Sequence, residues 1–91
     1  METVGRKTFL GCFNLESVRI PAGVGKLDDE CFSGCISLAS VTFERDSQLK
    51  VINGSTFSYC SDLRSMRIPP SVEVFDYRCF DGCVNLREVT F

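Results

Sequence analysis

The sequence repeats one unit of about 23 residues four times, and this repeat constrains the fold more than any other feature. The columns fit the frame Φ-x-x-Φ-x4-F-x-x-C-x-x-L-x-x-Φ-x-Φ, where Φ is apolar, at residues 1–20, 24–43, 49–68 and 72–91. One column is entirely cysteine, with spacings of 23, 25 and 23 residues: Cys12, Cys35, Cys60 and Cys83. A single unit cannot bury its own apolar face, whereas stacked copies can. The repeat therefore predicts a solenoid.

Each unit ends in L-x-x-Φ-x-Φ, whose strict alternation predicts a strand with one buried face. The strands are expected within residues 15–20, 38–43, 63–68 and 86–91. Pro21 and Pro69 end two of them, because proline cannot donate to a strand ladder. We expect the four strands to form one parallel sheet on the concave face.

The segment that leads to each cysteine predicts a short helical turn on the convex face. It begins at Gly5, Asp28, Asn53 or Asp76, and three of these four residues are good N-caps. Phenylalanine and cysteine then lie three residues apart on one helical face. Asn53-Gly54-Ser55 also matches the glycosylation sequon, but the shared column favours an N-cap role. The predicted fold class is an α/β leucine-rich-repeat-like solenoid.

Composition limits the classes of protein to which the chain can belong. Its 91 residues suit one small domain, and 44% hydrophobic content with eight Phe suffices for a continuous core. A net charge of −2 argues against a nucleic-acid binder. No apolar run is long enough to span a membrane. Residues 1–7 lack the apolar core of a signal peptide, so the residues alone leave the location unknown.

Six cysteines permit two interpretations. Neighbouring members of the cysteine column would lie about 5 Å apart, which is compatible with disulfides. Packing alone also explains the column, as a ladder of buried free thiols, and we favour this interpretation. Cys31 and Cys79 stand four residues before a ladder cysteine, but the chain has no histidine. We therefore expect neither a metal site nor a catalytic thiol, and no cofactor.

Two segments carry a resemblance to a known family. FSGCISLASVTF at 32–43 and CSDLRSMRIPPSV at 60–72 resemble the BspA-type leucine-rich repeat, whose units read roughly F-x-G-C-x-x-L-x-x-I-x-I-P-x-x-V-x-x-I. The resemblance covers essentially the whole chain and departs at Phe43-Glu44, where Ile-Pro is usual. It implies a cell-surface or secreted protein that adheres to host proteins, cells or glycans. The absence of histidine and of any Gly-rich phosphate loop counts against an enzyme.

The strand alternation nominates a binding surface, because the third and fifth positions of L-x-x-Φ-x-Φ point outward. We expect these side chains to share the concave face, where repeat proteins usually bind. Arg19 and Arg67 would lie about 10 Å apart with Thr42 between them, as a grip for an acidic partner. An ordinary solvated face is the alternative. The candidate residues at these positions are Ser17, Arg19, Ser40, Thr42, Ser65, Arg67, Glu88 and Thr90, and Arg64 and Arg87 flank them as further candidates.

The sequence thus predicts an adhesion-type module that binds a protein partner, with a structural spacer in a longer repeat array as the alternative. The first unit starts at Met1 and the last stops at Phe91 without a polar cap. Because solenoids need caps, we expect residues 1–91 to be one domain cut from a longer array. Uncapped ends also predict end-to-end self-association.

Overall fold

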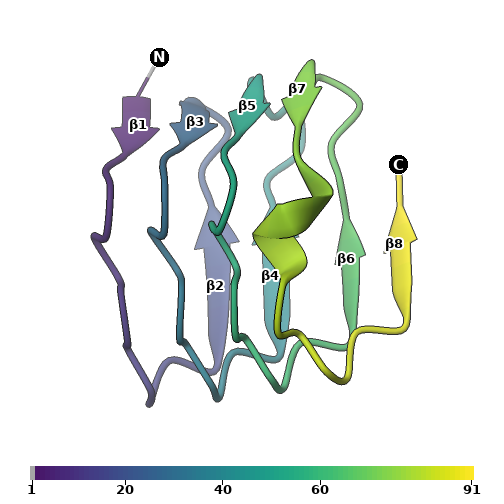
Figure 1. Cartoon of the computed structure of the whole chain (residues 1–91). Helices are drawn as coiled ribbons and strands as arrows, with labels where there is room; N and C mark the ends of the chain where they lie inside the picture. Colours follow the sequence, from purple (N-terminus) through teal and green to yellow (C-terminus); the bar gives the residue numbers. More distant parts are fainter. Residues whose placement is uncertain (1) are drawn as a thin grey trace.

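The chain winds through short parallel strands that stack side by side into a solenoid (Figure 1). The computed structural model describes residues 2–91, so that Met1, expected to open the first unit, lies outside the described residues. The Cα outline measures 28 × 25 × 20 Å. The elements are β1 (Glu2–Val4), β2 (Ser17–Ile20), β3 (Val24–Leu27), β4 (Ser40–Phe43), β5 (Val51–Ile52), β6 (Ser65–Arg67), β7 (Val74–Phe75), the 3-10 helix η1 (Tyr77–Phe80) and β8 (Glu88–Thr90).

The strands form two layers. The odd-numbered strands make a continuous parallel sheet in the order β1-β3-β5-β7, which we call the front sheet. The even-numbered strands, which we call the back strands, pair as β2-β4 and β6-β8. The predicted parallel strands are confirmed, but the expected single sheet from these strands is not found. No pairing joins β4 to β6 in the described part of the chain, and we call this gap the split.

The predicted helical turns are wrong for three of the four units. Residues 6–11, 29–34 and 54–59 form hydrogen-bonded turns, and η1 is the one helical segment among residues 2–91. Alternate N–H groups in these turns bond to the next unit: Phe9 N–H donates to the Cys31 carbonyl at 2.7 Å, and Phe32 N–H donates to the Thr56 carbonyl at 3.0 Å. An α-helix would use those donors within its own turn. Stacking against the next unit therefore replaces the helix.

The backbone conformation of these turns follows from the same stacking. Lys7, Glu30 and Ser55 occupy one column and adopt φ values of 61°, 57° and 63°. A positive φ interrupts any right-handed helix. The fourth member of the column, Arg78, lies in η1, where the N–H donates to Asp76 Oδ1 at 2.9 Å instead of to a neighbouring unit. Only the unit without a following unit in this chain thus adopts a helical turn.

The expected N-caps divide in the same way. Asp76 caps η1 as predicted. Asn53 instead donates from Nδ2 to Asp28 Oδ1 in the preceding unit at 2.9 Å. This bond and the backbone hydrogen bond from Asp29 hold the pKa of the Asp28 carboxyl below its usual value, the latter having the larger effect. Asn53 therefore links two units rather than capping a helix.

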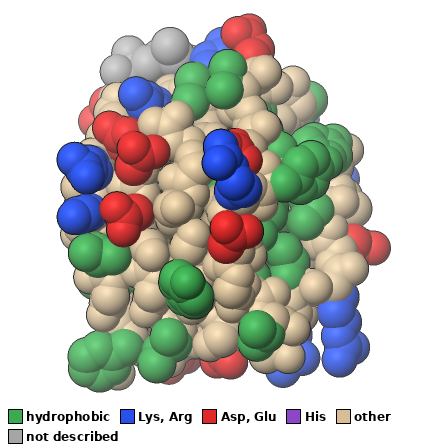
Figure 2. All heavy atoms as spheres, in the orientation of Figure 1, with side chains coloured by type: hydrophobic (Ala, Val, Ile, Leu, Met, Phe, Trp, Pro, Cys, Tyr) green, Lys and Arg blue, Asp and Glu red, His purple; other side chains and the backbone are tan. Residues whose placement is uncertain are grey.

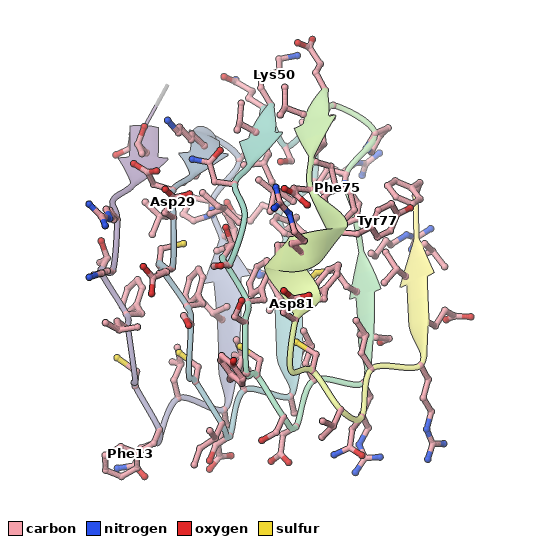
Figure 3. All side chains as sticks on the ribbon, in the orientation of Figure 1. Phe13, Asp29, Lys50, Phe75, Tyr77 and Asp81 are labelled. Carbon is pink, nitrogen blue, oxygen red and sulfur yellow. The ribbon has the colours of Figure 1, made fainter. Side chains whose placement is uncertain are left out.

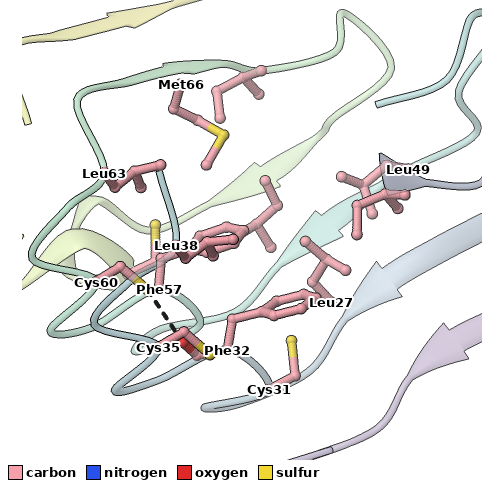
Figure 4. Packing of buried hydrophobic residues seen from close by; sticks show 14 of the residues in the cluster. Leu27, Cys31, Phe32, Cys35, Leu38, Leu49, Phe57, Cys60, Leu63 and Met66 are labelled. Carbon is pink, nitrogen blue, oxygen red and sulfur yellow. Dashed lines mark hydrogen bonds between the residues drawn. The ribbon is translucent and has the colours of Figure 1, made fainter. Parts of the chain in front are cut away.

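The core lies between the two layers and runs along the solenoid (Figure 4). Leu38 and Leu63 are fully buried, whereas Leu15 and Leu86 in the outer units are half-buried. The phenylalanine column forms a stack, with ring centroids 5.1, 5.6 and 6.0 Å apart from the first unit to the last: Phe9, Phe32, Phe57 and Phe80. The apolar columns of the sequence are therefore real columns of the core.

All six cysteines are free thiols. Three members of the cysteine column donate Sγ–H to a phenylalanine carbonyl of the preceding unit, at 3.0–3.2 Å. One such bond runs from Cys60 to Phe32 and is drawn in Figure 4. These three thiols therefore act as small donors that tie one unit to the one before it, which supplements the packing role that the sequence suggested.

Candidate functional site

The structure places all ten candidate residues at exposed positions on or beside the back strands. Along each strand the outward residues alternate with inward ones, as β2 illustrates with exposed Ser17 and Arg19, half-buried Val18 and buried Ile20. This is the period of two that a half-buried strand requires. The alternation in the sequence therefore placed these side chains outward correctly.

The split divides the candidate residues into two groups. In the first group Ser17 pairs with Ser40 and Arg19 pairs with Thr42 across β2 and β4. In the second group the pairs across β6 and β8 are Ser65–Glu88 and Arg67–Thr90. Thr42 and Arg67 share a repeat column but are not paired, because they lie on opposite sides of the split. The continuous surface expected from the sequence is thus two adjoining patches.

The back strands carry more positive than negative charge. Arg19, Arg67, Arg64 and Arg87 are all exposed, and Arg87 N–H donates to the Arg64 carbonyl at 2.8 Å, which keeps those two backbones adjacent. None of the four arginines forms an ion pair within the described residues. Their guanidinium groups remain available to an external carboxylate.

The opposite side of the molecule differs in its charge pattern. Figure 2 shows acidic and basic side chains interspersed over the front sheet and its turns. Both ion pairs of residues 2–91 lie there: Lys50 with Glu73 at 3.7 Å and Arg78 with Asp76 at 2.7 Å. The pairing holds the pKa of the Asp76 carboxyl below its usual value. Because charges of both signs are interspersed on this side, it presents no single sign of charge to a partner.

A groove with a volume of about 670 Å³ opens at the split. The ends of β4 and β6 form its walls, and the connectors 44–48 and 69–71 form its rim. Thr42 and Arg67, both nominated from the sequence, line it together with Phe43, Ile68 and Phe91. We call this the split groove. Its volume falls within the range typical of ligand pockets.

Sequence reasoning did not find the split groove, although one signal marked its position. The connector 44–48 is two residues longer than the connectors 21–23 and 69–71. The repeat analysis used this length only to explain the spacing of 25 residues. The extra loop lines the groove, and Asp46 within it adopts a φ of 64°. An insertion in an otherwise regular repeat was therefore the available clue.

The cysteines lack the properties of activated nucleophiles. Burial raises the pKa of the Cys31, Cys60 and Cys79 thiols to about 12, and it also raises the pKa of Cys35 and Cys83. These thiols therefore stay protonated near neutral pH, whereas the thiolate is the reactive form.

Within residues 2–91 no group of three or more Cys, Asp or Glu side chains is arranged to hold a metal ion. The described residues also contain no helix that could cross a membrane.

Comparisons with known proteins agree with this architecture. A family model described as a BspA type leucine rich repeat region of six copies matches residues 1–91. A crystal structure of a leucine-rich repeat protein from Bacteroides capillosus is 27% identical, with a TM-score of 0.85 over 99% of this chain. A leucine-rich repeat protein from T. pallidum is 22% identical, with a TM-score of 0.63 over 99% of this chain, and shares the fold. The chain spans 62% and 63% of their lengths. No curated protein matches the sequence.

Proposed function

Because the chain belongs to the BspA-type leucine-rich repeat family, we propose that it is a protein-binding module whose partner contacts the outer face of the back strands. The observation that carries this proposal is the set of four exposed arginines, Arg19, Arg64, Arg67 and Arg87, which have no ion-pair partner among the described residues. Unpaired guanidinium groups on a rigid strand face favour an acidic partner. Adhesion to a host or cell-surface protein or glycan is the form of binding that the family resemblance suggests.

The size of the molecule limits the affinity that this face can provide. The Cα outline of 28 × 25 × 20 Å gives a face of at most about the 800 Å² per partner that a standard interface buries. We therefore expect weak binding by these residues alone. Additional units of the same kind would enlarge the face and strengthen binding.

Binding to intact animal cells tests the proposal. Fluorescently labelled wild-type protein should bind, and the double variant Arg19→Glu/Arg67→Glu should lose about 90% of the bound signal, because each reversed charge removes a charge-assisted contact. The matched control is Arg6→Glu/Lys7→Glu, which makes the same change in net charge at exposed residues away from the back strands. The wild-type signal should also decrease with salt.

Two outcomes contradict the proposal. Loss of binding in both double variants would indicate a general charge effect with no specific face. Loss of binding on Asp28→Lys or Glu30→Lys, with the back-strand variant unaffected, would move the working face to the turns. Treating the cells with protease or glycosidase beforehand distinguishes a protein partner from a glycan.

A spacer function is the second candidate, and the length of the solved relatives favours it. The chain spans about three-fifths of each of those proteins, so its units match one part of a longer array. A spacer predicts no saturable binding by residues 1–91 and no effect of either double variant.

Self-association is a separate proposal. It rests on Tyr77 and Phe91, which are 65% and 69% exposed in the last unit, and light scattering across concentrations measures it.

A further inference from the structure

The chain passes from its front turns to the back strands at four corners, which line up along one edge of the solenoid at the bottom of Figure 1. We call this edge the corner edge, and it comprises residues 11–16, 34–39, 59–64 and 82–87. We infer that it binds a second copy of this chain, in a two-fold symmetric dimer whose two solenoids run antiparallel. The inference goes beyond the proposed function, because the corner edge includes neither Arg19 nor Arg67.

The first observation is the apolar character of the corners. In each corner the leucine N–H donates to the cysteine carbonyl three residues earlier, at 3.0–3.1 Å, which closes a tight turn. The tips of such turns usually carry Gly, Pro, Asn, Asp or Ser. Here the first tip position holds Phe13, Ile36 and Val84 in three of the four units, and these side chains are 62%, 51% and 79% exposed. Figure 3 shows Phe13 at this edge, pointing away from the solenoid.

The second observation is that the third unit supplies an apolar side chain at the corner edge from a different position. Its turn tip begins with Ser61, but Tyr59, two residues earlier, is 64% exposed. The other units have glycine in the column of Tyr59, at φ values of 69–78°, and Tyr59 adopts a φ of 63°, which is sterically disfavoured for a residue with a Cβ. Its ring lies over Gly82 of the fourth unit, where a Cβ would come within 2.4 Å of Tyr59 Cδ1.

Each unit thus contributes one large exposed apolar side chain to the corner edge, and Figure 2 shows apolar side chains spaced along it. Ile36 and Tyr59 belong to the two inner units, so their exposure does not arise from the ends of the chain. A row of exposed apolar side chains on neighbouring units is typical of a protein–protein contact, because burial removes it from water.

The third observation is the order of the charges beside this row. The last column of the corner edge reads Glu16, Ala39, Arg64 and Arg87. Ala39 N–H donates to the Glu16 carbonyl at 2.9 Å, and Arg87 N–H donates to the Arg64 carbonyl at 2.8 Å, so these residues are stacked neighbours. The three charged residues of the column and Asp62 have no ion pair within residues 2–91. The first unit therefore carries a negative charge, the fourth carries a positive charge, and Asp62 offsets Arg64 in the third.

This order of charges favours a second copy over other occupants. The four ionised side chains sum to zero, so a strongly charged protein or an anionic membrane surface gains no net attraction from this edge. In an antiparallel dimer the first unit of each copy faces the fourth unit of the other, and Glu16 lies opposite Arg87 twice because of the two-fold symmetry. A parallel arrangement would place each of these charges opposite its like.

The size of the molecule sets the expected strength of the dimer. No side of the Cα outline exceeds 28 × 25 Å, so the corner edge buries at most about the 800 Å² per partner of a standard interface. We expect a dissociation constant on the order of 100 µM. Analytical ultracentrifugation from about 10 µM to about 1 mM should give an average mass that levels off at twice the monomer mass, since a two-fold interface is used up in the dimer. No association at about 1 mM, or association that continues beyond two copies, would overturn the inference.

Two pairs of exposed residues locate the interface. Val84→Glu places a charge in the apolar row and should raise the dissociation constant at least about 10-fold, whereas Val74→Glu makes the same change on β7, outside the corner edge, and should alter it by less than about 2-fold. Tyr59→Ser and its control Tyr77→Ser should differ in the same way. Circular dichroism verifies that each variant is folded. Equal effects of Val74→Glu and Val84→Glu, or of the two tyrosine changes, would show that the corner edge is not the interface.

A charge exchange tests the antiparallel orientation. Glu16→Arg and Arg87→Glu should each raise the dissociation constant at least about 5-fold, because each places like charges opposite each other twice. The combined variant exchanges the two charges and should return the dissociation constant to within about 2-fold of wild type. Failure to recover would contradict the antiparallel dimer. Arg19→Glu/Arg67→Glu, which tests the proposed function, should leave the dimer unchanged, so that the two proposals can fail separately.

Discussion

The front sheet and the back strands are built from the same repeat, but only one of them is continuous. β3 and β5 pair through Lys26–Val51 and Leu27–Ile52 across the boundary between the second and third units. β4 and β6 lie at the same boundary and do not pair. The longer connector 44–48 leaves the end of β4 at this boundary. The comparison teaches that a solenoid can accommodate an insertion on one layer while the other layer keeps its register.

The split does not extend into the core that the two layers share. Phe32 and Phe57 stack across the same boundary at 5.6 Å with an interplanar angle of 6°. The Cys60 thiol donates to the Phe32 carbonyl across it at 3.2 Å. The difference between the layers is therefore confined to the outer face of the back strands, where partner binding is proposed.

The largest expected effect tests whether the core is continuous beneath the split. Leu63 precedes β6 and is fully buried, so Leu63→Ala should lower the free energy of unfolding by about 2–5 kcal/mol. Leu38→Ala, on the other side of the split, should lower the free energy of unfolding by a similar amount. Leu15→Ala should lower it less, because Leu15 is only half-buried. Chemical denaturation measures all three. A negligible loss for Leu63→Ala alone would mean that the split reaches the core.

The second prediction concerns alkaline pH and the Cys60 thiol at the same boundary. Burial raises the pKa of this thiol from its ordinary value of 9.0 to about 12. Between pH 9 and 12 the unfolded chain therefore releases this proton while the folded chain keeps it, so stability falls as pH rises. The slope attributable to Cys60 should be on the order of 1 kcal/mol per pH unit.

Urea denaturation from pH 7 to 11 measures this slope in wild-type protein and in Cys60→Ala. The variant should be less stable at pH 7 but should lose less stability above pH 9. Equal slopes would show that Cys60 is accessible to solvent and that the boundary is open.

The third prediction tests whether the length of the connector 44–48 separates β4 from β6. Deleting Asp46 and Ser47 shortens the connector 44–48 to the length of the other two connectors. β4 and β6 should then pair, and the amide protons of Thr42 and Arg67 should exchange about 10-fold more slowly as they gain hydrogen bonds. Stability should rise by about 1 kcal/mol. Hydrogen exchange followed by NMR measures the protection.

A same-length variant controls for the sequence of the connector. Replacing Asp46 and Ser47 by two glycines keeps the length and should leave amide exchange at Thr42 and Arg67 unchanged. If the glycine variant also gains protection, connector length is not what separates β4 from β6.

The smallest expected effect concerns the front sheet. Lys50 and Glu73 form an exposed ion pair at 3.7 Å on this side of the molecule. Exposed pairs contribute little, so Lys50→Ala should change the free energy of unfolding by less than about 0.5 kcal/mol. Thermal melts at low and high salt measure it. A larger, salt-dependent loss would indicate that surface charge, and not strand register, keeps the front sheet continuous.

Two features of the fold were mispredicted for local reasons. No sheet was predicted from the Φ-x-x-Φ segments that form the front sheet, because Φ-x-x-Φ spaces its apolar residues by three and does not display the alternation of a strand. The turns before each cysteine were expected to be helical, because Asp28 and Asn53 are good N-caps. Both residues instead bond to each other across units. The local helix propensity of a segment cannot predict a hydrogen bond to a partner in a neighbouring unit.

The sequence by itself determined the units, their register and the direction of the side chains. Its apolar columns became the stacked core, since apolar burial depends on which residues recur and at what period. The exposed positions of Arg19, Thr42 and Arg67 followed from the same alternation.

The tertiary structure alone decided how neighbouring units bond to each other. It directed the hydrogen bonds of alternate turn N–H groups to the next unit and paired the strands of the front sheet. It also left β4 and β6 unpaired, with the split groove between their ends. The physical reason is that each of these outcomes depends on backbone groups of two units that are 23 or 25 residues apart. Every residue except proline carries the same backbone donor and acceptor, so side-chain patterns do not reveal which of them will meet.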